Sequence, residues 1–183
     1  MILSKNTFRQ NCLKTLKNSS KHNRVYKTAL LNKKLMILLG RKKRQKILLY
    51  YPLDMEVDIV KSLIKLRKNN DIYLPFMVEQ SFKMVPFRLP LRRKKFNILE
   101  AGNTHRKINK IDIAVVPVVG VDGNLQRVGF GKGMYDRFFE KLPKRPYIIF
   151  TQLELCYTKK LICDTHDIAC DLIITPKKII GKI

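Results

Sequence analysis

The chain has 183 residues, of which 45% are hydrophobic, and its 38 Lys and Arg against 14 Asp and Glu give a formal net charge of +24 at pH 7. This length and composition fit one globular domain that can bury a core, and they exclude fibrous and disordered classes. No apolar run approaches the roughly 18 residues that cross a bilayer and no signal peptide is recognisable, so we expect a cytoplasmic protein without membrane association.

Apolar spacing in the first half of the chain predicts alternating helices and strands. The predicted elements are a helix over 6–16, a helix over 25–39, a strand over 47–51, a helix over 55–66 and a strand over 72–74. Gly40 ends the second helix, and Pro52 and Pro75 close the two strands. Two prolines among alternating apolar residues over 81–91 predict an edge hairpin or irregular strands.

The second half continues the alternation. It predicts a strand over 111–119, a helix over 135–142 and strands over 147–150 and 172–174. Strands that alternate with helices indicate an α/β fold: a single three-layer domain over 1–183, with a largely parallel central sheet flanked by helices.

Four cysteines, Cys12, Cys156, Cys163 and Cys170, are few for this length. Their spacing differs from the CxxC pairs of structural zinc sites, although His166 lies among the last three. Reduced thiols are therefore expected rather than a metal centre.

The segment Arg127–Asp136, RVGFGKGMYD, predicts a phosphate-binding loop that runs into a helix. Alternate glycines let the backbone approach a bulky anion, and the helix that follows directs free N–H groups and its positive dipole end towards it. Arg127 and Lys132 add full positive charges. A Walker A loop and a dinucleotide fingerprint are both excluded by the glycine spacing. A glycine-rich connection without a ligand remains the alternative.

Two aspartates near this segment are candidate Mg²⁺ ligands. Asp136 lies in the first turn of the predicted helix, where it could stabilise the helix dipole or hold Mg²⁺ beside a nucleotide. Asp171 opens the last predicted strand and could converge on the same edge of the sheet, although its spacing alone favours a strand-capping role.

The sequence resembles the 5-formyltetrahydrofolate cyclo-ligase family, also called 5,10-methenyltetrahydrofolate synthetases. The family motif R-x-G-x-G-x-G-Y-Y-D is matched by Arg127, Gly129, Gly131, Gly133, Tyr135 and Asp136. Weaker matches lie in the expected order at 5–9 (KNTFR), 51–57 (YPLDMEV), 166–171 (HDIACD) and 173–175 (IIT). The resemblance covers essentially the whole chain.

This resemblance implies an enzyme that uses ATP and Mg²⁺ to convert 5-formyltetrahydrofolate, with or without a polyglutamate tail, into 5,10-methenyltetrahydrofolate. The formyl oxygen would attack the γ-phosphorus of ATP, and N10 of the folate would then displace phosphate as the ring closes. Such a protein acts mainly by positioning and charge neutralisation.

The resemblance also assigns roles to individual residues. Catalytic roles fall to Arg127, Lys132 and Tyr135. ATP contacts fall to Lys5, Arg9, Arg127, Gly129, Gly131, Lys132, Gly133, Met134 and Tyr135. Folate contacts fall to Arg9, Tyr51, Glu56, Phe130, Gly131 and Met134. Asp136 and Asp171 would hold Mg²⁺.

One departure from the motif lies inside the glycine segment. Met134 stands where the family has the first of two tyrosines, which replaces a ring and hydroxyl by a flexible thioether. A relative that binds nucleotide but has a changed substrate is therefore one alternative. A basic RNA- or ribosome-associated protein is another, favoured by the charge and disfavoured by its even spread along the chain. We expect a monomer that does not bind nucleic acid.

Overall fold

The computed structural model describes residues 3–93, 99–104 and 108–181. In these residues the helices are α1 (Lys5–Lys21), α2 (Arg24–Leu39), α3 (Val60–Leu66) and α4 (Met134–Glu140). None of the helices in this part of the chain is both long and apolar enough to cross a membrane.

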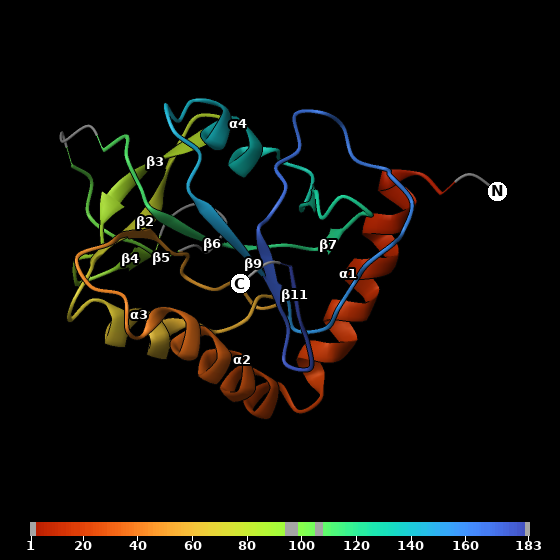
Figure 1. Ribbon diagram of the computed structural model, residues 1–183, viewed down its shortest axis with the longest axis horizontal. Helices are drawn as coiled ribbons and strands as arrows, with labels where there is room; N and C mark the ends of the chain where they lie inside the picture. Colours follow the sequence, from red (N-terminus) through yellow and green to blue (C-terminus); the bar gives the residue numbers. More distant parts are fainter. Residues whose placement is uncertain (1–2, 94–98, 105–107, 182–183) are drawn as a thin grey trace.

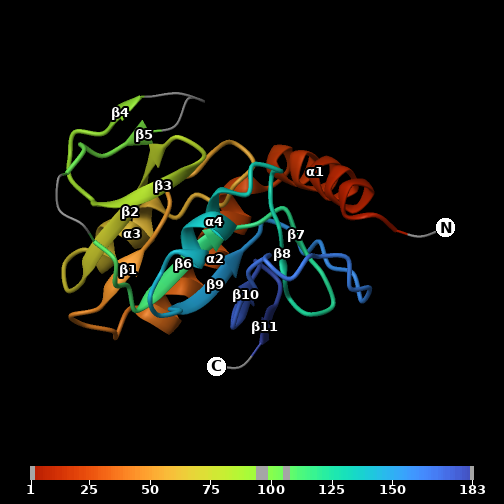
Figure 2. The same ribbon diagram turned by 90° about the horizontal axis from the view of Figure 1, so that it is seen from above.

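A mixed sheet forms the centre of the molecule (Figures 1 and 2). In spatial order its strands are β11 (Ile179–Gly181), β10 (Leu172–Ile174), β9 (Tyr147–Thr151), β6 (Ile113–Pro117), β1 (Lys46–Leu48), β2 (Asp71–Val78) and β3 (Ser81–Pro86). The inner pairings are parallel, whereas β11 and β3 add to the two edges antiparallel. Two small antiparallel pairs are β4 (Arg92–Arg93) with β5 (Leu99–Glu100) and β7 (Gly120–Val121) with β8 (Arg127–Val128).

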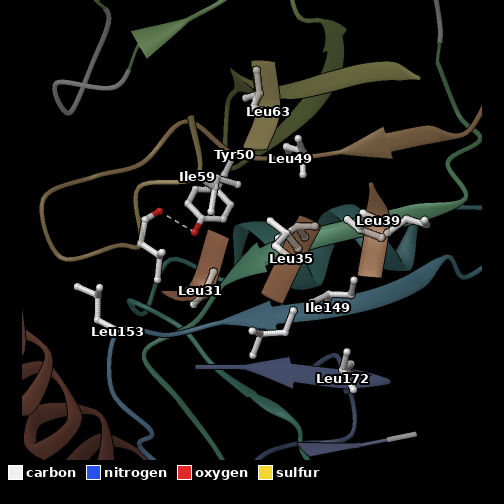
Figure 3. Close-up of a cluster of buried hydrophobic side chains, with 14 of the residues drawn as sticks. Leu31, Leu35, Leu39, Leu49, Tyr50, Ile59, Leu63, Ile149, Leu153 and Leu172 are labelled. Atoms are coloured by element: carbon white, nitrogen blue, oxygen red, sulfur yellow. Dashed lines mark hydrogen bonds between the residues drawn. The ribbon is translucent and has the colours of Figure 1, made fainter. Parts of the chain in front are cut away.

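Helices cover both faces of this sheet, so the predicted three-layer α/β fold is confirmed. Leu31, Leu35 and Leu39 recur at helical spacing along α2 and pack with Ile149 and Leu172 of the sheet, as Figure 3 shows. α1 and α3 contribute to the same cluster, and both views place α1 beside β7. Phe138 of α4 belongs to a second cluster on the opposite face.

Two predicted boundaries were wrong, and one strand was missed. The second strand does not end at Pro75, because β2 continues to Val78. β1 pairs with β2 only as far as Tyr73, so at Pro75 only the β3 side of the strand has a neighbour and a proline is tolerated as at an edge. The third helix begins at Val60 rather than Met55. The edge strand β11 was not predicted at all.

The parallel strands determine where a site can form. β1, β6 and β9 run in the same direction, so the segments that follow them leave from one edge of the sheet. In open α/β sheets, ligands bind in the crevice outside these carboxyl ends. Residues 49–56 and 118–128 both begin there.

Candidate active site

A pocket of about 690 Å³ opens at the carboxyl ends of β1 and β6, a volume suited to small-molecule ligands. Its walls come from residues 50–56, the β2–β3 hairpin and residues 127–137, with Pro117 at the end of β6. The sequence-predicted residues that line it are Tyr51, Glu56, Arg127, Phe130, Gly131, Lys132, Gly133, Met134 and Tyr135. The structure thus brings together most of the predicted site.

The glycine segment, residues 129–133, joins β8 to α4 in a backbone path that needs glycine. Gly131 and Gly133 adopt left-handed φ angles of +98° and +59°, and Gly133 is the N-cap of α4. Gly129 is required for a different reason. A Cβ at Gly129 would collide with the guanidinium of Arg127, which lies against the backbone there.

Arg127 is the buried cation of the pocket, with 5% of its surface exposed. Its Nη1 lies 3.3 Å from Asp136 Oδ2, and its guanidinium carbon lies 4.9 Å from the centre of the Tyr135 ring. Its Nε is buried and has no hydrogen-bond partner among the described residues. A buried donor without a partner is costly, and the described residues leave this hydrogen-bonding capacity of Arg127 unused.

Glu56 provides the buried carboxyl group of the same pocket. Its Oε2 accepts a hydrogen bond of 2.8 Å from the Leu53 amide, which closes a short turn after β1. Burial raises the pKa of Glu56 to about 7, although the Leu53 amide and the charge of Arg127 act in the opposite direction. Glu56 can therefore hold or release a proton near neutral pH.

Two tyrosines frame Glu56. Tyr50, labelled in Figure 3, donates a hydrogen bond of 2.9 Å to the Val57 carbonyl, so it fixes the segment that carries Glu56. It shares another hydrogen bond with the Thr151 hydroxyl. Burial and the Glu56 charge raise the pKa of Tyr135. The Tyr135 hydroxyl therefore stays protonated at neutral pH.

Lys5 and Arg9, both in α1, do not line the pocket. Arg9 donates from Nε to the Gly129 carbonyl at 2.9 Å, so it contacts the start of the glycine segment. Lys5 forms ion pairs with Asp164, at 3.0 Å, and with Asp167.

The two predicted metal ligands have separate partners. Asp136 accepts from the Ile168 amide and faces Arg127. Asp171 precedes β10 at the amino ends of the parallel strands, where Arg145 donates to both of its oxygens at 2.9 Å. Since the pocket lies at the carboxyl ends, the prediction that Asp171 converges on the pocket edge was wrong. The two aspartates therefore do not fit one shared Mg²⁺ site.

Several lining residues were missed from the sequence, among them Tyr50, Gln80 and Arg137. Tyr50 is adjacent to the predicted Tyr51. It could have been found from the sequence because it lies near the end of the apolar run over 47–51, where a parallel strand opens towards a site. Gln80 lies in the β2–β3 turn, about fifty residues before the glycine segment, and no local pattern connects the two.

The glycine segment precedes a helix at the carboxyl ends of the parallel strands, and a buried arginine with an unpaired N–H group lies beside it. These features are typical of an α/β enzyme whose pocket suits a phosphorylated ligand. Residues 2–176 match the model of the 5-formyltetrahydrofolate cyclo-ligase family. The chain belongs to this family.

Individual relatives agree with this assignment. The chain is 28% identical to the 5-formyltetrahydrofolate cyclo-ligase of Mycoplasma pneumoniae over 94% of its own length and 98% of the relative's. It is 30% identical to that of Mycoplasma genitalium, over 79% and 81%. A probable 5-formyltetrahydrofolate cyclo-ligase of Schizosaccharomyces pombe matches at 30% identity, but over only 49% of this chain and 51% of the relative.

Solved structures extend the likeness to the fold. The 5,10-methenyltetrahydrofolate synthetase of Aquifex aeolicus superposes with a TM-score of 0.80 at 26% identity, over 96% of this chain and 91% of that one. The two enzyme names describe the substrate and the product of one ring closure. The predicted family, enzyme class and activity are therefore confirmed.

Proposed function

We propose that this pocket binds 5-formyltetrahydrofolate and ATP side by side and that the chain closes the folate ring at the expense of ATP. The observation that supports the proposal is that buried Arg127, whose Nε has no hydrogen-bond partner among the described residues, and the Glu56 carboxyl group line the same pocket. The Arg127 guanidinium suits a phosphoryl oxygen, and the Glu56 carboxyl group suits the hydrogen-bonding edge of a pteridine.

The chemistry uses ATP to make a poor leaving group into a good one. The N5-formyl oxygen attacks the γ-phosphorus and ADP departs, which leaves a phosphorylated imidate. N10 then attacks the formyl carbon and loses its proton, and the C–O bond breaks as phosphate leaves with the formyl oxygen. The products are 5,10-methenyltetrahydrofolate, ADP and phosphate.

The protein contributes position and charge to these steps. Arg127 and Lys132 would neutralise the transferring phosphoryl group, while the glycine amides cradle the phosphates. Tyr135 keeps Arg127 in place through its ring. Fixed donors of this kind need no reorganisation during the reaction.

Folate would occupy the opposite side of the pocket. We assign Glu56 to the pteridine ring and Tyr51, Phe130 and Met134 to contacts along the ligand. Met134 offers a thioether instead of the tyrosine ring of the family motif, and a thioether still packs against flat rings.

α1 would supply the remaining nucleotide contacts. Arg9 has donors left after its bonds to Gly129 and Asn6, and we place them on ATP. Lys5 would have to leave Asp167 to reach the nucleotide, so its contact depends on movement of that ion pair.

We propose that ATP enters as its Mg²⁺ complex, held mainly through the phosphates. Asp136 lies in the first turn of α4 but already faces Arg127, and Asp171 lies with Arg145. We therefore assign Asp136 to the orientation of Arg127.

We further propose that residues 1–183 act as one monomeric domain in the cytoplasm. α1 and α4, which are far apart in the sequence, hold the same glycine segment, and this favours a single unit. The four cysteines are free thiols, as a reducing compartment would keep them.

Substitution of Arg127 tests this assignment. Arg127→Lys keeps a charge beside Asp136 but loses the planar fork, and we expect turnover of 5-formyltetrahydrofolate to fall about 100-fold or more while far-ultraviolet circular dichroism stays unchanged. Turnover within a few-fold of the wild type would contradict the role of Arg127.

A further inference from the structure

Arg137 joins two walls of the pocket that belong to different parts of the chain. It lies on α4, and its Nε donates to the Gln80 carbonyl at 3.0 Å. Its Nη2 donates to the same carbonyl and to the Lys132 carbonyl. Gln80 belongs to the β2–β3 turn and Lys132 to the glycine segment, and all three residues line the pocket.

The backbone at Gly133 lies close to the Arg137 guanidinium. Gly133 carries no side chain, and a Cβ there would lie 2.8 Å from Arg137 Nη1. On the other side, Glu79 holds a left-handed φ of +50°, which is unfavourable for a residue with a side chain. The hydrogen bonds from Arg137 hold Gln80, the next residue of this turn.

The glycine segment is therefore anchored at both ends by arginines. Arg9 of α1 holds the Gly129 carbonyl at 2.9 Å, and Arg137 of α4 holds the Lys132 carbonyl. Between these anchors Gly131 has open space around the position of a Cβ.

We propose that Arg137 is a positioning residue that fixes the glycine segment against the β2–β3 turn and thereby sets the width of the pocket for both substrates. This rests on the proposed function, because it takes the pocket to hold ATP and 5-formyltetrahydrofolate together. Arg137 acts through two backbone carbonyls, so its shape matters as well as its charge: a lysine cannot reproduce the fork.

Two variants and a matched control test the proposal. Arg137→Ala removes the clamp, and Arg137→Lys keeps the charge without the fork. Arg145→Ala is the control, because Arg145 also donates to a backbone carbonyl, that of Ala169, yet lies outside the pocket. Thermal unfolding of all three shows whether any effect reflects lost stability.

Amide hydrogen exchange of the ligand-free proteins reports on the clamp without any assumption about substrates. We expect faster exchange over 78–82 and 129–134 in both Arg137 variants and no change there in the control. Unchanged exchange in Arg137→Ala would overturn the proposal.

Steady-state kinetics then separate positioning from a general structural role. We expect the KM values for MgATP and for 5-formyltetrahydrofolate both to rise about tenfold in Arg137→Ala, with a smaller change in kcat, and little recovery in Arg137→Lys. KM values within twofold of the wild type, or full recovery by lysine, would overturn the proposal. A wild type without methenyl product would instead refute the proposed function, and hydrogen exchange would then decide the role of Arg137 alone.

Discussion

Gly129 and the Arg127 guanidinium are in such close contact that a Cβ added at Gly129 would collide with the guanidinium. We predict that Gly129→Ala lowers turnover about 100-fold, because its Cβ would displace the Arg127 guanidinium from the pocket. Gly102→Ala is the matched control, since a Cβ there meets nothing within 4 Å. Parallel assays of the two variants check this; equal activities would contradict the assigned contact.

Glu56 predicts a pH dependence of stability. Its pKa rises from 4.5 to about 7 on folding, so the native state binds more protons than the unfolded state between these values. The free energy of unfolding should therefore decrease as pH rises through this window, and the Glu56 contribution should level off above it.

The measurement is urea unfolding of the wild type and Glu56→Gln across this window. The difference between the two free energies should change by about 3 kcal/mol, in the direction of relative destabilisation of the wild type at higher pH. Glutamine keeps an acceptor for the Leu53 amide, so it is a conservative reference. A difference that does not vary with pH would contradict the buried, titrating carboxyl group.

At the level of elements, α1 joins the body of the protein through a narrow apolar stripe. Phe8, Cys12 and Leu16 recur every four residues and are buried, and Arg9 extends from the same helix to Gly129. We predict that Leu16→Ala lowers the free energy of unfolding by about 2–5 kcal/mol, whereas the neighbouring exposed Lys17→Ala changes it by about 0.5 kcal/mol or less. Denaturant unfolding checks this; similar values for both variants would place α1 outside the cooperative unit.

The strongly patterned elements could be predicted from sequence alone. The apolar runs that became β6 and β10 and the helical spacing of Leu31, Leu35 and Leu39 carried their own signals. Pro75 led to a wrong end for the second strand, because a proline is tolerated in a strand where the neighbouring strand has already ended, as β1 has at this point. The third helix was predicted to begin too early, at Met55. Glu56 falls within the predicted helix, but its side chain accepts a hydrogen bond from the Leu53 amide and closes a turn there.

Only part of the site could be predicted from the sequence. Residues 127–136 revealed the phosphate side because its glycines, cations and helix start are contiguous. The contact between Arg137 and Gln80 was not predictable, since the two residues are 57 positions apart and meet only through the fold. Asp171 was misplaced because a motif gives the order of residues but not the edge of the sheet to which each belongs.

For the whole molecule, the charge of +24 raises the question of polyanion binding. The proposed function predicts that excess single-stranded RNA leaves turnover unchanged at moderate salt. Inhibition that disappears steeply as salt rises would favour the RNA-associated alternative, because such binding depends on counterion release. A titration of RNA into the assay at two salt concentrations separates these outcomes.

The proposed activity can be tested in one reaction of the purified wild type with 5-formyltetrahydrofolate and MgATP, in which all products are measured together. We predict that 5,10-methenyltetrahydrofolate, ADP and phosphate appear in equal amounts, and that no methenyl product forms when ATP is left out. ATP hydrolysis without methenyl product over a range of folate concentrations would contradict the proposed cyclo-ligase activity.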